Sequence, residues 1–364
     1  MISARHSSNL DFLRAMAVLC VVAFHLLLQH QTFSFGALNL HDLGHWGVLM
    51  FFVHTSLVLM FSLERMPQSW SGRSRYGDFI VRRTFRLWPL SAAAVLLIFA
   101  MHLPLEFANG HFRPALFNAP TLVSNLLLIQ DITHTDSIEA PLWSLPYEVQ
   151  MYLCLPLLFW VVTRSRAIWP ATMLFALAVA CAVAISLSVR IPKALPWIPW
   201  DLLQYTPCFV AGVFAFALWR RELPRLPGSL WPAVVLALTL CYLMGFGGDR
   251  WISPGWTLCL ALGVGTALFE PLSTGWLVRL CEVIARYSYG IYLTHFFCIW
   301  FAFSHLHTAS TVMRWATFAA LAVTLPLAFY HAIEEPMIRV GARLSARIFG
   351  RPREPAEPQL LPVG

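Results

Sequence analysis

The chain alternates between long apolar stretches and short polar segments from one end to the other. Each apolar stretch, as a helix rising about 1.5 Å per residue, is long enough to cross a hydrocarbon core of roughly 30 Å. We therefore predict an all-α fold, a polytopic membrane bundle of about ten transmembrane helices. The predicted spans are residues 10–28, 46–63, 87–103, 145–162, 168–189, 202–219, 230–246, 255–269, 287–304 and 312–333.

A weaker apolar segment, residues 116–129, lies between the third and fourth predicted spans. Pro120 and Asn125 interrupt it. Irregular backbone is tolerated at membrane depth only where protein or water satisfies its polar groups. We predict that this segment is a re-entrant or interfacial piece rather than another span.

The composition agrees with a membrane protein. Of the 364 residues, 58% are hydrophobic and only 12% are charged, whereas soluble domains have about a quarter of their residues charged. The composition therefore excludes an ordinary soluble domain. We expect one membrane-embedded domain, residues 1–340, followed by a basic and proline-rich cytoplasmic tail, residues 341–364.

The distribution of charge tests the number of spans, because cytoplasmic loops retain Lys and Arg. With ten spans and a cytoplasmic N-terminus, all but five of the 25 Lys and Arg residues fall on inner segments. The exceptions are Arg113, Arg190, Lys193, Arg250 and Arg314. We expect both termini in the cytoplasm, and we interpret the net charge of +7 as an orientation signal and a contact with anionic lipid headgroups, not with nucleic acid.

The eight cysteines are scattered, almost all within predicted spans, and form no paired spacing. They are typical of small buried hydrophobic residues. The outer histidines show no metal-ligand spacing on a common helix face, apart from the loosely spaced His305 and His307. We predict neither a disulfide framework nor a metal site.

Ionisable groups inside a span are costly and indicate function. Arg14 and His25 are eleven residues apart in the first span, a separation of about 16 Å along a helix axis and about 20° around it. Both side chains are therefore predicted to face one cavity, where the imidazole can take up and return a proton. The alternative interpretation is that Arg14 reaches lipid headgroups and His25 hydrogen-bonds a neighbouring helix.

Three arginines, Arg82, Arg83 and Arg86, precede the third span in the segment "DFIVRRTFRLWPL". At spacings of three and four residues on a helix, their guanidinium groups are expected on one side, as a cluster suited to phosphate. This pattern predicts a phosphate-containing ligand at the cytoplasmic side. The alternative is a basic flank that binds lipid and sets topology.

The segment "APLWSLPYEVQMYL" opens the fourth span with Glu148 and Tyr152 on one helix face and Trp143 at the interface. We predict that Glu148 lies at a depth similar to His25 and supports its imidazole, unless Glu148 faces extracellular water. Late in the chain, Tyr292 and His295 are spaced for an interhelical pair. Glu334 and Glu335 are expected to meet arginines at the inner surface.

These patterns together resemble the integral-membrane acyltransferase-3 family of bacterial enzymes, which O-acylate surface polysaccharides, lipopolysaccharide and related sugars. The resemblance covers about residues 8–345, in the order of the family's motifs. "GHWGVLMFFVHTSLVLM" in the second span departs from the family pattern, so the substrate lining is expected to differ there. The matching residues are Arg14 and His25 in "LDFLRAMAVLCVVAFH"; Arg82, Arg83, Arg86 and Pro89; Trp143, Ser144, Leu145, Glu148 and Tyr152; Tyr289, Gly290, Tyr292 and His295; and "IEEP".

The resemblance implies an O-acyltransferase of the bacterial inner membrane. It implies acyl-coenzyme A, most often acetyl-coenzyme A, as cytoplasmic co-substrate and a hydroxyl of a periplasmic glycan as acceptor. The catalytic candidates are His25, Glu148 and Tyr152, the coenzyme A candidates are Arg14, Arg82, Arg83 and Arg86, and the weaker acceptor candidates are Trp143, Ser144, His54, Tyr292 and His295. His25 is expected either to act as general base or to carry the acyl group.

The competing interpretation is a proton-coupled transporter or flippase of a sugar or a lipid-linked substrate. Buried Arg, His and Glu would then form a proton relay. This class favours internal repeats or Gly- and Pro-broken helices at matching positions of two halves, and the sequence contains neither.

Overall fold

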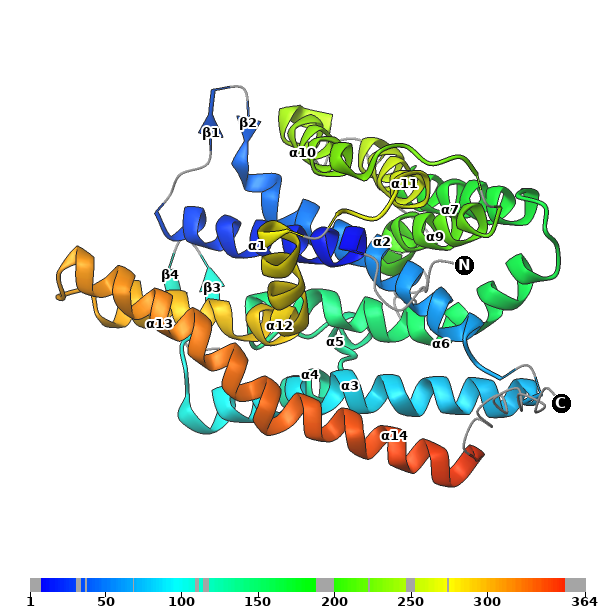
Figure 1. Cartoon of the computed structure of the whole chain (residues 1–364). Coiled ribbons are helices and arrows are strands. Elements are labelled where there is room, and N and C mark those ends of the chain that lie inside the picture. Colours follow the sequence, from blue (N-terminus) through cyan, green and yellow to red (C-terminus); the bar gives the residue numbers. More distant parts are fainter. Residues whose placement is uncertain are drawn as a thin grey trace, which may run out of the picture.

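A computed structural model describes residues 8–30, 34–36, 38–67, 69–108, 111–113, 118–187, 200–221, 223–246, 253–273 and 275–350. Most of the helices lie roughly along one direction, as in a membrane bundle (Figure 1). The helices are α1 (Ser8–Gln29), α2 (Leu43–Glu64), α3 (Gly72–Met101), α4 (Ala119–Leu127), α5 (Gln130–Thr133), α6 (Leu145–Thr163), α7 (Trp169–Leu187), α9 (Trp200–Trp219), α10 (Trp231–Cys241), α11 (Ser253–Leu268), α12 (Trp276–Ile299), α13 (Thr311–Phe329) and α14 (Glu335–Phe349).

Short turns and hairpins connect these helices. The strands form two antiparallel hairpins, β1 (Ser34–Phe35) with β2 (Leu38–Asn39) and β3 (Glu106–Ala108) with β4 (His111–Arg113). The 3-10 turns are η1 (Leu40–Asp42), η2 (Ala140–Ser144) and η3 (Gly228–Leu230), and the π turns are η4 (Tyr242–Phe246), η5 (Trp300–His305) and η6 (Tyr330–Glu334).

The predicted all-α membrane bundle is confirmed. Within the described residues, eight helices are long and apolar enough to span a bilayer. The eighth predicted span corresponds to the shorter apolar helix α11. The ninth corresponds to α12, which begins at Trp276, before the predicted residue 287, because Arg279, Glu282 and Arg286 interrupt the apolar run without ending the helix.

Helix α2 is the centre of the bundle, in contact with α1, α6, α9 and α11. Two glycines permit these close contacts. A Cβ atom at Gly47 would lie 2.6 Å from the backbone oxygen of Ala17 on α1, and one at Gly212 of α9 would collide with Ser56 on α2. The side chains of α1 and α2 are therefore held in fixed positions relative to each other.

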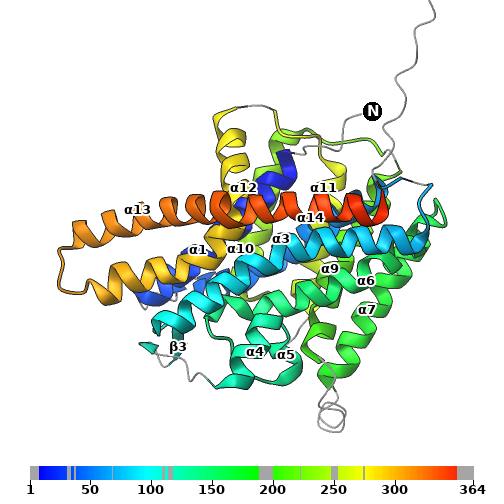
Figure 2. The ribbon, with the colours of Figure 1, turned by 90° about the horizontal axis from the view of Figure 1, so that it is seen from below.

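The other helices pack on two sides of this centre. Helices α7, α9, α10 and α11 lie on one side, and α3, α13 and α14 lie on the other (Figure 1). Seen from below, α14 runs beside α3 (Figure 2), in agreement with their extensive contact. Helices α6 and α12 lie between the two groups, where α12 packs against α1.

The described part of the weak apolar segment, residues 118–129, contains the short helix α4, and the short helix α5 follows it. Helix α4 has nine residues and is too short to span a bilayer, in agreement with the prediction that this segment is not another span. Its polar groups are satisfied internally. The buried Asn125 amide nitrogen donates to the carbonyl oxygens of Thr121 and Asp136, both at 2.9 Å, and its oxygen accepts from the Ile138 nitrogen. Helix α6 consequently starts beyond a short piece of non-spanning chain.

One end of the bundle, where α2 ends, α3 begins and α14 ends, is called here the arginine-rich end. It carries Arg65, Arg73, Arg75, Arg164 and Arg347. It corresponds to the predicted cytoplasmic side. Helix α14 continues past the predicted domain boundary at residue 340 to Phe349, and residues 351–364 of the predicted tail lie outside the described part of the chain.

Candidate active site

A cavity of about 440 Å³ lies among α1, α2, α3, α6 and α12. Its wall combines several arginines with hydroxyl groups, and it is called here the arginine cavity. The polar residues of its wall are Asp11, Arg14, His54, Thr55, Arg65, Arg83, Arg86, Ser144, Glu148, Tyr152, Ser288, Tyr289 and Tyr292. The cavity reaches the arginine-rich end through the exposed Arg65.

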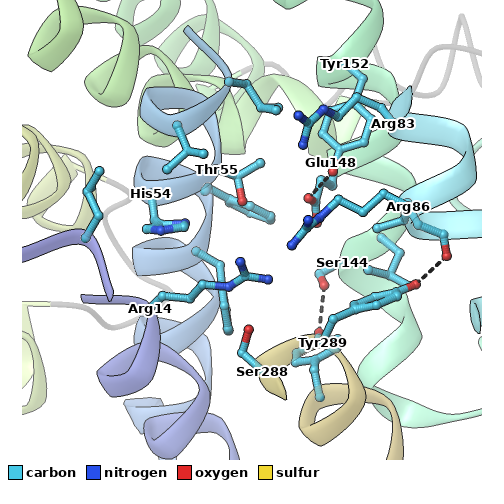
Figure 3. A pocket seen from close by; sticks show the side chains of 18 of the residues that line it. Arg14, His54, Thr55, Arg83, Arg86, Ser144, Glu148, Tyr152, Ser288 and Tyr289 are labelled. Carbon is cyan, nitrogen blue, oxygen red and sulfur yellow. Dashed lines mark hydrogen bonds between the residues drawn. The ribbon is translucent and has the colours of Figure 1, made fainter. Parts of the chain in front are cut away.

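Positive charge dominates this cavity, because four arginines face two carboxylates in its wall. Arg14 from α1 and Arg86 from α3 extend into it from opposite sides (Figure 3). The Nε atoms of Arg14 and Arg83 are buried and have no hydrogen-bond partner among the described residues. A buried guanidinium nitrogen without a hydrogen-bond partner is costly, so the cavity suits an anionic ligand.

The predicted cluster of three arginines is divided between two environments. Arg83 and Arg86 line the cavity, but Arg82 does not belong to its wall. The Arg82 Nε atom lies 2.8 Å from Asp78 Oδ1, and Asp78 also accepts a hydrogen bond from Ser345 of α14. Asp78 thus links α3 to α14 and also pairs with Arg82 on its own helix. The expectation that all three guanidinium groups lie on one side is therefore wrong, because Arg82 pairs with Asp78 outside the cavity wall.

Glu148 lies in the first turn of α6, after Pro146, and faces the cavity. Its carboxylate accepts a hydrogen bond from the hydroxyl of Tyr152 one turn later. Arg14, Arg83 and Arg86 are near enough to interact with its charge. Glu148 and Tyr152 therefore form part of the arginine cavity.

His25 has other partners than the sequence predicted. Its Nδ1 atom lies 2.9 Å from the Val21 oxygen and 3.1 Å from His295 Nε2, so His295 holds the place that we predicted for Glu148. The predicted shared wall also differs, because Arg14 lines the cavity and His25 does not. The rings of Tyr292 and His295 are 6.1 Å apart and those of His295 and His25 are 4.9 Å apart, which places His25 behind Tyr292 and His295.

The remaining predicted acceptor residues are divided in the same way. Ser144, His54 and Tyr292 line the cavity. Trp143 does not, and packs its ring instead against the rings of Tyr147 and Tyr205 at 5.9 and 5.6 Å. Trp143 therefore belongs to an aromatic cluster beside the cavity.

Glu334 is buried beside the site, although the sequence placed it at the inner surface. We expected both Glu334 and Glu335 at the inner surface, and Glu335 does bind Arg339 at 2.7 Å. Glu334, in the π turn η6, is only 1% exposed, and Arg14 and Arg86 are close enough to interact with its charge. Consecutive helical residues point about 100° apart, so two adjacent glutamates were a signal that one faces inward.

Comparison with known proteins assigns the chain to a family. The family model described as an acyltransferase domain, that of the acyltransferase-3 family, matches residues 7–333. The chain belongs to this family. It is 25% identical over 379 residues to the acyltransferase MdmB of Streptomyces mycarofaciens, with 92% of each chain covered.

A second relative is the protein named "Putative peptidoglycan O-acetyltransferase YrhL" of Bacillus subtilis (strain 168), which is 28% identical over 387 residues. That match covers 95% of this chain and 57% of YrhL. No solved structure matches the chain. The family makes this protein a multi-pass membrane enzyme that transfers acyl groups, rather than a transporter.

Proposed function

We propose that this acyltransferase moves an acyl group, expected to be acetyl, from cytoplasmic acyl-coenzyme A to a hydroxyl of a cell-surface or exported glycan. The expected location is the bacterial inner membrane, with the arginine-rich end in the cytoplasm. The printed name of YrhL, which refers to peptidoglycan O-acetylation, supports a glycan acceptor.

The observation that carries the proposal is the arginine cavity. Coenzyme A carries several phosphates, and guanidinium groups bind phosphate through paired hydrogen bonds. Arg14 and Arg83 each have a buried nitrogen that lacks a partner among the described residues, and Arg86 extends into the same cavity from the side opposite Arg14 (Figure 3). The volume of about 440 Å³ is within the range of roughly 300–1,000 Å³ of small-molecule sites.

In the proposed reaction, phosphates bind at Arg14, Arg83 and Arg86, and the thioester arm extends past Tyr292 toward His25. The acceptor hydroxyl attacks the thioester carbon. A carbon–oxygen bond forms, the carbon–sulfur bond breaks, and His25 takes the hydroxyl proton and then returns it to the departing thiolate. Alternatively, His25 attacks the thioester first, so that a carbon–nitrogen bond forms, the carbon–sulfur bond breaks and the thiolate leaves. The acceptor hydroxyl then attacks the acyl carbon, the carbon–nitrogen bond breaks, and the hydroxyl proton goes to the thiolate.

The test uses the purified enzyme in vesicles with acyl-labelled acetyl-coenzyme A and a soluble glycan fragment. The wild-type enzyme should transfer label to the glycan. His25→Ala should abolish transfer and keep expression and coenzyme A binding, whereas the control His307→Ala, at an exposed loop position, should transfer normally. Absence of transfer by the wild-type enzyme would overturn the proposed donor or acceptor, and retained transfer by His25→Ala would remove His25 from the reaction.

A further inference from the structure

His25 of α1 and His295 of α12 form a direct imidazole pair beyond the wall of the arginine cavity. His295 Nε2 lies 3.1 Å from His25 Nδ1, and their ring planes are inclined by 52°. The two residues are 270 positions apart in the sequence, and His295 is only 2% exposed. The fold therefore places a second buried base beside His25.

Backbone carbonyl groups determine where the hydrogens of this pair lie. His25 Nδ1 is 2.9 Å from the Val21 oxygen, and His295 Nδ1 is 2.8 Å from the Tyr292 oxygen and 3.2 Å from the Ile291 oxygen. A carbonyl oxygen only accepts hydrogen bonds, so each Nδ1 atom carries a hydrogen. Nε2 of each neutral ring consequently has a lone pair.

This arrangement fixes the direction of the bond between the rings. The His25 Nδ1–H group is shared between the Val21 oxygen and His295 Nε2, which accepts. Nε2 of His25 remains available to take a proton from a substrate. His295 thus holds the His25 ring in the orientation that a base requires.

We propose that His295 is a positioning residue that shares the proton taken up by His25, an inference that rests on the proposed function. When the acceptor hydroxyl transfers its proton to His25 Nε2, the Nδ1 proton of His25 moves toward His295 Nε2. When the thiolate of coenzyme A removes the Nε2 proton, the Nδ1 proton returns. Both rings end in their starting states, and no other reactant is needed.

The surroundings make a second base useful. The His25 ring packs against the rings of Phe24 and Phe296, with centroids at 4.8 and 5.1 Å, and Phe112 packs against Phe296 at 4.9 Å. Within the part of the chain that the structure describes, the polar partners of the pair are each other and three carbonyl oxygens. In such an apolar environment a localised imidazolium is costly, and spreading its charge over two rings lowers that cost.

The kinetic test compares His295→Gln with His295→Leu. A glutamine oxygen can accept the His25 hydrogen bond but cannot take the proton, whereas leucine does neither. We expect His295→Gln to lower kcat by about tenfold or more and His295→Leu to lower it further, both with an unchanged KM for acyl-coenzyme A. His307→Gln is the matched control and should behave as wild type. Wild-type kcat in His295→Gln would overturn the proposal.

A spectroscopic test does not depend on activity. In ¹⁵N-histidine-labelled enzyme in bilayers, a nitrogen–nitrogen coupling through the hydrogen bond should join His25 Nδ1 to His295 Nε2, and it should vanish in His295→Gln. A His25 ring that carries its hydrogen on Nε2 would overturn the proposal. If the coupling is present but wild-type enzyme transfers no acyl group, the proposed function fails and the geometry of the pair stands.

Discussion

The hydroxyl of Ser144, at the end of η2, lies 2.7 Å from the hydroxyl of Tyr292 on α12. Tyr292 also lies 2.6 Å from the Pro141 oxygen, which only accepts, so Tyr292 donates to Pro141 and Ser144 donates to Tyr292. Both side chains line the arginine cavity and are buried. The ring of Tyr292 lies 6.1 Å from the ring of His295, which does not line the cavity.

The first prediction is that Ser144 and Tyr292 are energetically coupled. Tyr292→Phe leaves the buried hydroxyl of Ser144 without its acceptor, at a cost of about 1–3 kcal/mol, and Ser144→Ala removes the donor. We expect the double variant to be less destabilised than the sum of the single variants by about 0.5 kcal/mol or more. Thermal unfolding in detergent measures this cycle, and strictly additive changes would show that the two hydroxyls do not interact.

Glu139, which precedes η2, is an unusual carboxyl group. It is 0% exposed, and neither of its carboxyl oxygens has a hydrogen-bond partner among the described residues. Burial raises the pKa of Glu139 well above its usual range. The side chain is therefore protonated in the folded protein at pH values at which the unfolded chain has ionised.

This shift makes stability depend on pH. Between the ordinary pKa and the raised pKa the folded state binds more protons, so folding loses about 1.4 kcal/mol for each pH unit of rise within that window. Glu139→Gln removes the ionisation. We expect the variant to match wild type near pH 4 and to have the higher melting temperature above pH 7.

The exposed Glu270 provides a matched control for this measurement. The difference in melting temperature between Glu270→Gln and wild type should not grow between acid and neutral pH. If the difference in melting temperature between Glu139→Gln and wild type stays constant from pH 4 to above pH 7, Glu139 is not the titrating group.

The bundle was predictable because hydropathy is a local property. Each of the ten apolar runs corresponds to a helix of the bundle. The polar Asn125 indicated correctly that the weaker segment is not another span. The start of α12 was missed because Arg279 and Arg286 interrupt the apolar run but lie in the helix. Charged residues on the exposed face of a helix resemble loop residues when only hydropathy is read.

The site was predictable in its residue types but not in its pairings. Arg14, Arg83, Arg86 and Glu148 do share a cavity. The partner of His25, however, comes from a helix 270 residues later, and no local spacing encodes such a contact. Helix periodicity gives the face on which a side chain lies, whereas its partner depends on which helix packs there.

For Arg82, the sequence did contain a local signal of its partner, but the prediction of a three-arginine cluster did not use it. Asp78 precedes it by four residues, the spacing of an ion pair on one helix face. Asp78 is buried and Arg82 is drawn to it, away from Arg83 and Arg86. The three arginines therefore differ in their surroundings, which leads to the last prediction.

Arg86→Ala should weaken binding of acyl-coenzyme A to purified enzyme by about tenfold or more, because it removes a charged hydrogen-bonding group from the cavity. The affinity of the wild-type enzyme should fall as salt rises, and the variant should show a shallower dependence, because it has one fewer cation for the phosphates. Arg82→Ala is the matched control on the same helix. It should bind acyl-coenzyme A within about twofold of wild type but unfold at a lower temperature, because the buried Asp78 loses its ion pair. Equal losses of affinity in both variants would mean that the three arginines bind the ligand as one cluster, and that the contact between Arg82 and Asp78 yields when coenzyme A arrives.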